Sequence, residues 1–306
     1  MRTGFAVVRA LAAACATVIS FGASAQPTEA AQAEFAAAIE AANKAAVNGP
    51  SDIKLIDQAV LKLPGGLVYV PAAEAKRLLV AMGNRSSEGL LGMVASPAQD
   101  AEWFIVMRFI KSGYIKDDDA KDWNVNDLLK GMKEGTEEAN SERRTRGLPE
   151  IEVVGWVEAP AYDAAMHRLV WSLESKQKGA PAAAERGVNY NTYALGREGY
   201  VSMNLVTGMR HVQAEKPIAH NLLAALQYND GKRYGDFNSA TDHVAEYGLA
   251  ALIGGVAAKK LGLFALAFAF LAKFAKVIGV AAIAIGAVFL KFFRKKKAEV
   301  PPPPQA

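Results

Sequence analysis

Four histidines are the side chains of this 306-residue chain that can exchange protons near neutral pH. One of them, His167, lies in a segment that we expect to form a strand, with Asp163 before it and Ser172 after it. A base, an orienting carboxylate and a nucleophile are the three parts of an acyl-transfer centre. These residues are therefore the candidate for a hydrolytic centre near His167, if folding brings them together. The alternative is a structural or surface histidine.

Metal and cofactor sites find little support in the spacing of residues. The sequence has no H-E-x-x-H, G-x-S-x-G, Walker or G-x-G-x-x-G pattern, which removes the local marks of zinc peptidases, α/β-hydrolases and nucleotide enzymes. The remaining histidines are too widely separated for their spacing to suggest a metal site; they are His211, His220 and His243. We assign no catalytic, cofactor-binding or metal-binding residue, and we expect no cofactor.

An acidic run imitates the first half of a calcium loop at Asp122–Asn126. The imitation fails because Asp127 replaces the required glycine, and Lys133 replaces the bidentate glutamate. We expect instead that carboxylates and amides between Asp117 and Asp127 cap the following helix, whose N-terminus favours negative charge.

Aromatic residues suggest two further candidates. The tryptophans could line a ligand groove, although aromatic residues on strands usually belong to a core. They are Trp103, Trp123, Trp156 and Trp171. A second group stands before the apolar C-terminal segment and is either a joint that relays the state of the domain or a set of turns and caps. It contains Tyr234, Asp236, Phe237 and Asp242.

The elements that position these residues fall into three blocks of charge. The net charge of +4 is the sum of +2 over residues 1–25, −6 over residues 26–247 and +8 over residues 248–306. Basic residues are therefore concentrated at the ends, which argues against a nucleic-acid-binding domain. Because 51% of residues are hydrophobic, the middle block can form a core and is not expected to be disordered.

Residues 1–25 have the pattern of an export signal. Two arginines precede the apolar residues 10–22, and Ala23-Ser24-Ala25 is an A-x-A cleavage pattern before Gln26. An uncleaved anchor is the alternative, but the apolar run is shorter than the ~20 residues that span a bilayer.

The single cysteine, Cys15, lies inside this signal. A lipoprotein signal has a bulky aliphatic residue three positions before its cysteine, whereas this chain has Ala12. After cleavage the chain would contain no cysteine, which excludes disulfides and thiolate catalysis.

Residues 248–293 carry the second membrane signal. As a helix, Leu261–Leu290 would be about 45 Å long, which exceeds the ~30 Å hydrocarbon core. We expect one transmembrane helix within residues 261–293, with a hairpin as the alternative. Each lysine in this segment costs about 2.5 to 3.5 kcal/mol at the bilayer centre, so their placement is left open. They are Lys259, Lys260, Lys273 and Lys276.

The membrane segment also suggests partners and an orientation. Pairs such as Ala275/Gly279 allow close helix contact, so we weigh self-association or an envelope protein partner beside the lipid bilayer. The basic cluster Arg294–Lys297 should stay cytoplasmic, together with the Pro-rich remainder of residues 294–306. We therefore expect an inner-membrane protein of bacteria with its main domain in the periplasm.

The middle block should contain an α+β domain. Residues 26–50 form an Ala-rich helical lead-in, a spacer or a loosely docked helix ended by Asn48-Gly49-Pro50, and residues 51–247 form the extracytoplasmic domain. Short connections favour an antiparallel sheet with flanking helices, and Gly199 indicates a hairpin turn. The expected strands are 53–63, 67–70, 90–94, 103–110, 152–157, 165–175, 188–195 and 200–206, and the expected helices are 72–82, 125–146 and 216–227.

A set of aromatic, glycine and aspartate positions resembles the domain-of-unknown-function 2167 family. The residues are Gly113-Tyr114-Ile115, Asp117–Asp119, Gly155-Trp156, Pro160–Asp163, Trp171, Thr192–Arg197, Gly199-Tyr200, Tyr234–Phe237, Asp242 and Tyr247-Gly248. The resemblance covers nearly all of residues 53–248. It implies a membrane-anchored bacterial protein and no established reaction, cofactor or catalytic residue.

Two functions follow for the envelope domain. The first is a non-enzymatic module that binds a ligand, a partner protein or a lipid surface. The second is an envelope hydrolase with its centre near His167. We prefer binding, because a hydrolase more often leaves a recognisable local pattern.

Overall fold

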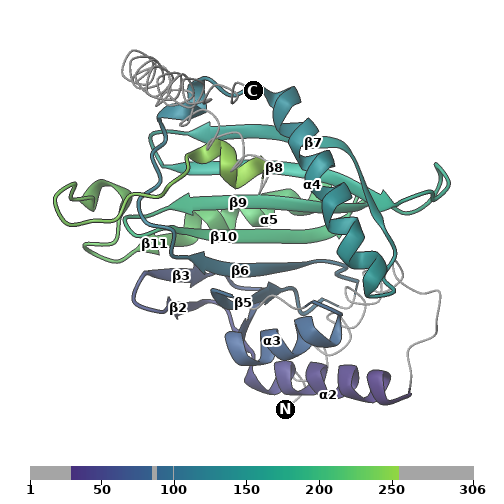
Figure 1. Cartoon of the computed structure of the whole chain (residues 1–306). Coiled ribbons are helices and arrows are strands. Elements are labelled where there is room, and N and C mark those ends of the chain that lie inside the picture. Colours follow the sequence, from purple (N-terminus) through teal and green to yellow (C-terminus); the bar gives the residue numbers. More distant parts are fainter. Residues whose placement is uncertain (1–28, 85–87, 99, 255–306) are drawn as a thin grey trace, which may run out of the picture. The chain divides into compact units, whose positions relative to one another are not determined.

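An eight-stranded antiparallel sheet forms the centre of the domain (Figure 1). The computed structural model describes residues 29–84, 88–98 and 100–254. The strands follow the order β1-β4-β5-β6-β10-β9-β8-β7. They are β1 (Val47–Asn48), β4 (Val68–Pro71), β5 (Leu90–Ala95), β6 (Phe104–Ile110), β7 (Ile151–Asp163), β8 (Arg168–Gln177), β9 (Gly187–Leu195) and β10 (Tyr200–Gly208). The expected α+β class with an antiparallel sheet is confirmed.

One face of this sheet is covered by helix α5 (Val212–Ala225) and by a smaller sheet of order β11-β3-β2. The small strands are β2 (Ser51–Leu55), β3 (Ala59–Leu63) and β11 (Leu226–Tyr228). Side chains alternate between the faces of a strand, so every second residue of β6 and β10 enters this layer. Met107 and Met203 are directly paired across these strands and fully buried.

Three helices pack on the other face (Figure 1). Helices α2 (Glu29–Ala45) and α3 (Ala72–Ala81) cover strands β4, β5 and β6, whereas α4 (Val125–Thr145) lies over β7 and β8. Ala38 and Ala42 of α2 are fully buried. The lead-in is therefore a docked part of the fold and not a spacer, because its small side chains allow close packing.

Polar side chains fix both ends of α4. Asn124 accepts hydrogen bonds from the backbone N–H groups of Asn126 and Asp127, which confirms the predicted cap. Near the other end, Asn140 is fully buried and bonds to both the N–H and the carbonyl oxygen of Ile151, at 2.8 Å each. The amide of Asn140 thereby ties α4 to the start of β7.

Two predicted elements differ from the structure. The expected strand 53–63 is two strands, because the chain turns at Ile56, which has φ of +51°, and no glycine or proline marks that turn. The expected helix 216–227 begins earlier, at Val212, and its last residues pair with β3 as β11. Tertiary pairing overrides helical periodicity there.

No helix in the described ranges is both long and apolar enough to cross a bilayer. The expected export signal at residues 1–25 and most of the expected membrane segment, from residue 255 onward, lie outside the described residues.

Glu215 of α5 gives the fold a pH dependence that can be measured. Burial raises the pKa of its carboxyl above 4.5, although Thr207 donates a hydrogen bond to it and His211 also favours its charge. A raised folded pKa stabilises the fold fully at low pH, and this contribution is lost as the pH rises through the folded pKa. We expect Glu215→Gln to increase the free energy of unfolding at pH 7 relative to the parent chain, and the gain to shrink towards pH 4. Urea denaturation across that range measures it, and a gain that is the same at every pH would contradict the assignment.

Candidate functional site

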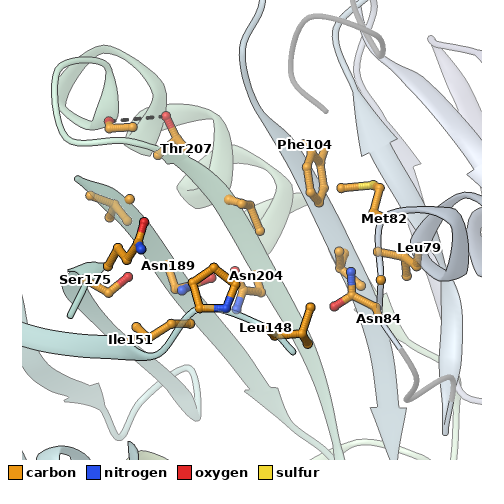
Figure 2. A pocket seen from close by; sticks show the side chains of 18 of the residues that line it. Leu79, Met82, Asn84, Phe104, Leu148, Ile151, Ser175, Asn189, Asn204 and Thr207 are labelled. Atoms are coloured by element: carbon orange, nitrogen blue, oxygen red, sulfur yellow. Dashed lines mark hydrogen bonds between the residues drawn. The ribbon is translucent and has the colours of Figure 1, made fainter. Parts of the chain in front are cut away.

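A cleft of about 690 Å³ opens on the face of the large sheet that carries α2, α3 and α4. Figure 2 shows its floor and walls. Strands β6, β10, β9 and β8 form the floor, residues of α2 and the end of α3 form one wall, and the segment after α4 forms the opposite wall. The volume is typical of a small-molecule or peptide-segment site.

The strand register orders the floor into rows. Phe104, Val206 and Asn189 are aligned across β6, β10 and β9. Two residues further along β6, Val106 is aligned with Asn204 and Asn191. Arg108 follows two residues after Val106 on the same face of β6 and also lines the cleft. The floor therefore passes from an aromatic ring, through amides, to a guanidinium.

A chain of amides crosses the middle of the floor. Asn204 donates through Nδ2 to Oδ1 of Asn191 at 3.0 Å, and Asn191 donates to the carbonyl oxygen of Asn189 at 3.3 Å. Oδ1 of Asn204 is buried and has no hydrogen-bond partner within the described part of the chain. A buried acceptor without a hydrogen bond reduces the stability of the fold. A hydrogen-bond donor from a ligand or from solvent would remove this cost.

Apolar side chains form much of the two walls. Leu79 and Met82 face the cleft from the α3 side, and Leu148 and Ile151 face it from the α4 side (Figure 2). A hydrogen bond of 3.0 Å from Arg146 to the carbonyl oxygen of Gly83 joins the walls. Apolar walls over a polar floor are the usual design of a ligand site.

Charged groups also line the cleft. They are Glu102, Arg108, Arg143, Glu150, Lys176 and Glu185. Burial lowers the pKa of Arg108 and of Arg143, and the nearby Arg146 lowers that of Arg143 further. Arg143 donates through Nε to the carbonyl oxygen of Pro149 at 2.7 Å.

The predicted centre at His167 is not assembled in the predicted way. Asp163 accepts hydrogen bonds from the N–H groups of Ala165 and Met166, so its carboxylate shapes the turn between β7 and β8. Ser172 is fully buried, and it is paired in register with Tyr190, which belongs to the core layer under α5. The triad prediction is therefore wrong: the nucleophile faces another layer of the molecule.

His167 instead contacts Asp117 and Tyr162. Its Nδ1 is 3.2 Å from the Tyr162 hydroxyl and 3.5 Å from Oδ2 of Asp117, to which Tyr162 donates at 2.6 Å. Burial, followed by the hydrogen bond to Asp117, raises the pKa of Tyr162. The ring of His167 stacks on Tyr234 with centroids 4.0 Å apart.

Tyr234 continues a column of rings. Its ring centroid is 4.4 Å from that of Tyr114, which in turn stacks on Phe237 at 3.9 Å. The hydroxyl of Tyr234 donates to the carbonyl oxygen of Ile115. The column thus fastens the loop after β6 to the segment after β11.

The same loop caps the helical residues 249–254. Asp119 accepts through its two oxygens from the N–H groups of Leu249 and Ala250, at 3.0 and 3.1 Å. A Cβ at Gly248 would lie 2.5 Å from Oδ2 of Asp119, so glycine permits this approach. We call the contacts between residues 113–119 and 233–250 the junction.

Turn and cap contacts also hold the rest of the junction. Asp236 accepts from the N–H of Arg233, and Asp242 accepts from the N–H of Asn238. Asp242 in addition makes a bidentate ion pair with Arg197, at 2.6 and 2.8 Å. The turns predicted for this segment are present, but the expectation that they cap the following helix is wrong, because Asp119 caps residues 249–254. The ion pair of Asp242 with Arg197 adds a contact with the β9–β10 turn.

Comparison with known proteins assigns a family. A model described as "Protein of unknown function (DUF2167)" matches residues 47–286. The chain belongs to the DUF2167 family. No curated protein matches the chain. Among solved structures, the chain is similar to the solution structure of cyanobacterial PsbP (CyanoP) from Synechocystis, with 10% identity and a TM-score of 0.34, over 60% of this chain and 91% of that one.

Most of the residues that carried the DUF2167 resemblance meet at the junction and in the core beside it. Gly113 donates its N–H to Glu198 in the β9–β10 turn, and Trp171 makes edge contacts with Trp156 and Tyr193. None of the four tryptophans lines this cleft. Trp103 and Trp171 are core residues, as is usual for aromatic residues on strands.

The remaining histidines are dispersed among the described residues, where no group of three metal-binding side chains occurs. His211 lies 3.5 Å from Glu102, and Nε2 of His220 is 2.7 Å from the Tyr190 hydroxyl. The cleft itself escaped sequence reasoning, because its residues come from distant segments. The alternating asparagines of β9, Asn189 and Asn191, are a local signal that could have indicated a polar face on this strand.

Asp119 can be tested as the cap of residues 249–254 in this DUF2167 protein. Asp119→Ala removes both acceptors, so we expect hydrogen exchange at Leu249 and Ala250 to accelerate by about 2- to 30-fold, for a lost cap of about 0.5–2 kcal/mol. The exposed neighbour Asp118→Ala is the matched control and should leave exchange unchanged. Equal acceleration in both variants would contradict the assignment.

Proposed function

We propose that this DUF2167 protein is a membrane-anchored binding protein of the bacterial cell envelope. In this proposal residues 1–25 direct export, residues 248–293 hold the chain in the inner membrane, and the acidic domain between them lies in the periplasm. The domain binds a ligand or partner in the cleft and performs no reaction on it.

The cleft is the observation that carries the proposed binding. Its apolar walls supply contact area, and the amides of Asn189 and Asn204, which line the floor, supply polar groups that can fix a ligand's orientation. The charge pattern and apolar length of residues 248–293 support the anchoring. The junction supports it as well, because its contacts tie residues 249–254, at the start of the proposed anchor, to the loop after β6.

Photo-crosslinking in living cells tests the cleft. A benzoylphenylalanine at Asn189, which is exposed and lines the cleft, should form adducts with the bound ligand or partner. The same probe at the exposed Lys133 of α4, outside the cleft, is the control. We expect the Asn189 adduct to disappear when Met82→Trp, on the α3 wall, fills the space of the cleft. Equal adducts at both positions, or an Asn189 adduct that survives Met82→Trp, would sink the proposal.

Cysteine labelling tests the topology, because the chain has no cysteine besides Cys15. In spheroplasts, we expect a membrane-impermeant maleimide to label Lys133→Cys, and to label Ala306→Cys only after the membrane is permeabilised. Mass spectrometry should find Gln26 as the first residue. Labelling of Ala306→Cys in intact spheroplasts would exclude a cytoplasmic C-terminus.

A further inference from the structure

The two walls of the cleft lie on opposite sides of its floor, so the cleft runs along the strands. Helices α2 and α3 pack over β4, β5 and β6, and α4 packs over β7 and β8. Strands β10 and β9 lie between these two groups of strands in the sheet. Leu79 and Met82 belong to one wall, and Leu148 and Ile151 belong to the other (Figure 2). A ligand in the cleft therefore meets apolar side chains on both sides and polar groups beneath it.

Two amides of the floor are offset by two residues along the strands. Asn204 is aligned with Asn191, so Asn189 lies two residues from that level on the neighbouring strand. Two residues of strand span about 7 Å. Asn189 is exposed, and both Asn189 and Asn204 line the cleft. The floor therefore offers amide groups at an interval of about 7 Å along its length.

One of these amides has a free acceptor. Nδ2 of Asn204 donates to Asn191, whereas its Oδ1 has no hydrogen-bond partner among the residues that the structure describes. The χ2 torsion of asparagine is soft, so a rotation of this amide can present Oδ1 to the cleft. A ligand that brings an N–H group to this point would remove the cost of an unpaired acceptor.

An extended peptide repeats its backbone groups at the interval of these amides. The N–H and C=O groups of every second residue point to one edge of the segment, about 7 Å apart. The side chains point away from that edge, alternately to either side. An asparagine amide carries a donor and an acceptor, as a peptide group does. A peptide that lies edge-on along the floor thus brings its backbone to Asn189 and Asn204 and its side chains to the two walls.

The charge of the lining favours a ligand without charge. Of the six charged residues named above, three are acidic and three are basic, so their formal charges cancel. A charged ligand group would lose hydration against the apolar walls and would gain no net attraction from the lining as a whole. An uncharged ligand avoids this cost.

We infer that the cleft binds an uncharged, extended peptide segment of a partner protein, with one backbone edge on Asn189 and Asn204 and with apolar side chains on both walls. This inference rests on the proposed function, since it names the ligand class of the same cleft. A saccharide chain could use the same amides, but it has no apolar side chains that alternate between two opposite walls. The arrangement of the walls therefore favours the peptide.

A photoreactive peptide tests the inference on the full-length protein in native membranes. The probe is the blocked tetrapeptide acetyl-Val-Leu-Val-Leu-amide with photoleucine in place of its first leucine. We expect adducts on residues 79–84 or 148–151, identified by peptide mass spectrometry. The same tetrapeptide without photoleucine should compete for them, whereas chitotetraose should not.

N-methylated competitors test whether a backbone edge is recognised. An analogue methylated at every amide nitrogen keeps the side chains but loses the donors of both edges, so it should compete roughly fivefold or more worse than the parent tetrapeptide. An analogue methylated only at alternate residues keeps one complete edge and should still compete. It controls for the added methyl groups.

Variants of the floor connect this preference with the two amides. Asn189→Leu and Asn204→Leu each remove one amide, so each should reduce the advantage of the parent tetrapeptide over its fully methylated analogue about twofold or more. Asn126→Leu, in the first turn of α4 and outside the cleft, removes an exposed amide elsewhere and should change nothing. If Asn204→Leu does not fold, Asn189→Leu and the analogue series still decide.

Three outcomes would overturn the inference. Equal competition by the parent and the fully methylated tetrapeptide would show that no backbone edge is recognised. Competition by chitotetraose and not by the tetrapeptide would assign the cleft to a saccharide. Absence of tetrapeptide adducts from the cleft, together with a retained crosslink from benzoylphenylalanine at Asn189, would show that the ligand belongs to another class. Loss of that crosslink as well would remove the proposed function itself.

Discussion

The rest of the structure depends on one constraint, which is that both faces of the large sheet must be covered. Eight strands span about 34 Å, and both faces must be shielded from water over that width. Helix α5 and the small sheet cover one face. On the other face, α2 and α3 cover the β4 side and α4 covers the β7 side, each helix being about 10 Å across. The central strands β6, β10 and β9 are left with a polar and partly apolar surface, and this is the floor of the cleft.

Sequence reasoning recovered the features that local chemistry controls. The short connections gave the antiparallel α+β class, Asn124 was expected within the capping run, and Gly199 occupies its predicted hairpin turn, where a Cβ would collide with the carbonyl oxygen of Ile110. The split at Ile56 and the strand β11 were missed because tertiary pairing decides them. His167 found its carboxylate in Asp117, far away in sequence, and no pattern of spacing could have indicated that contact.

The cleft and the junction are built from different sets of residues. The residues that resemble the DUF2167 pattern build the aromatic column, the Asp119 cap and the Arg197–Asp242 ion pair, which join the sheet to the beginning of residues 248–293. The cleft draws on a different set, the amides of β9 and β10 and the apolar walls.

The hydrogen bond between Arg146 and Gly83 joins the two walls of the cleft. It crosses directly from one wall to the other, and a hydrogen bond with a charged donor contributes about 1.5–3 kcal/mol, less when it is exposed to water as this one is. Breaking it leaves the sheet, both helical layers and the junction intact. Opening of the cleft at this point therefore requires the loss of one hydrogen bond and no unfolding of the sheet or of the helices that form its walls.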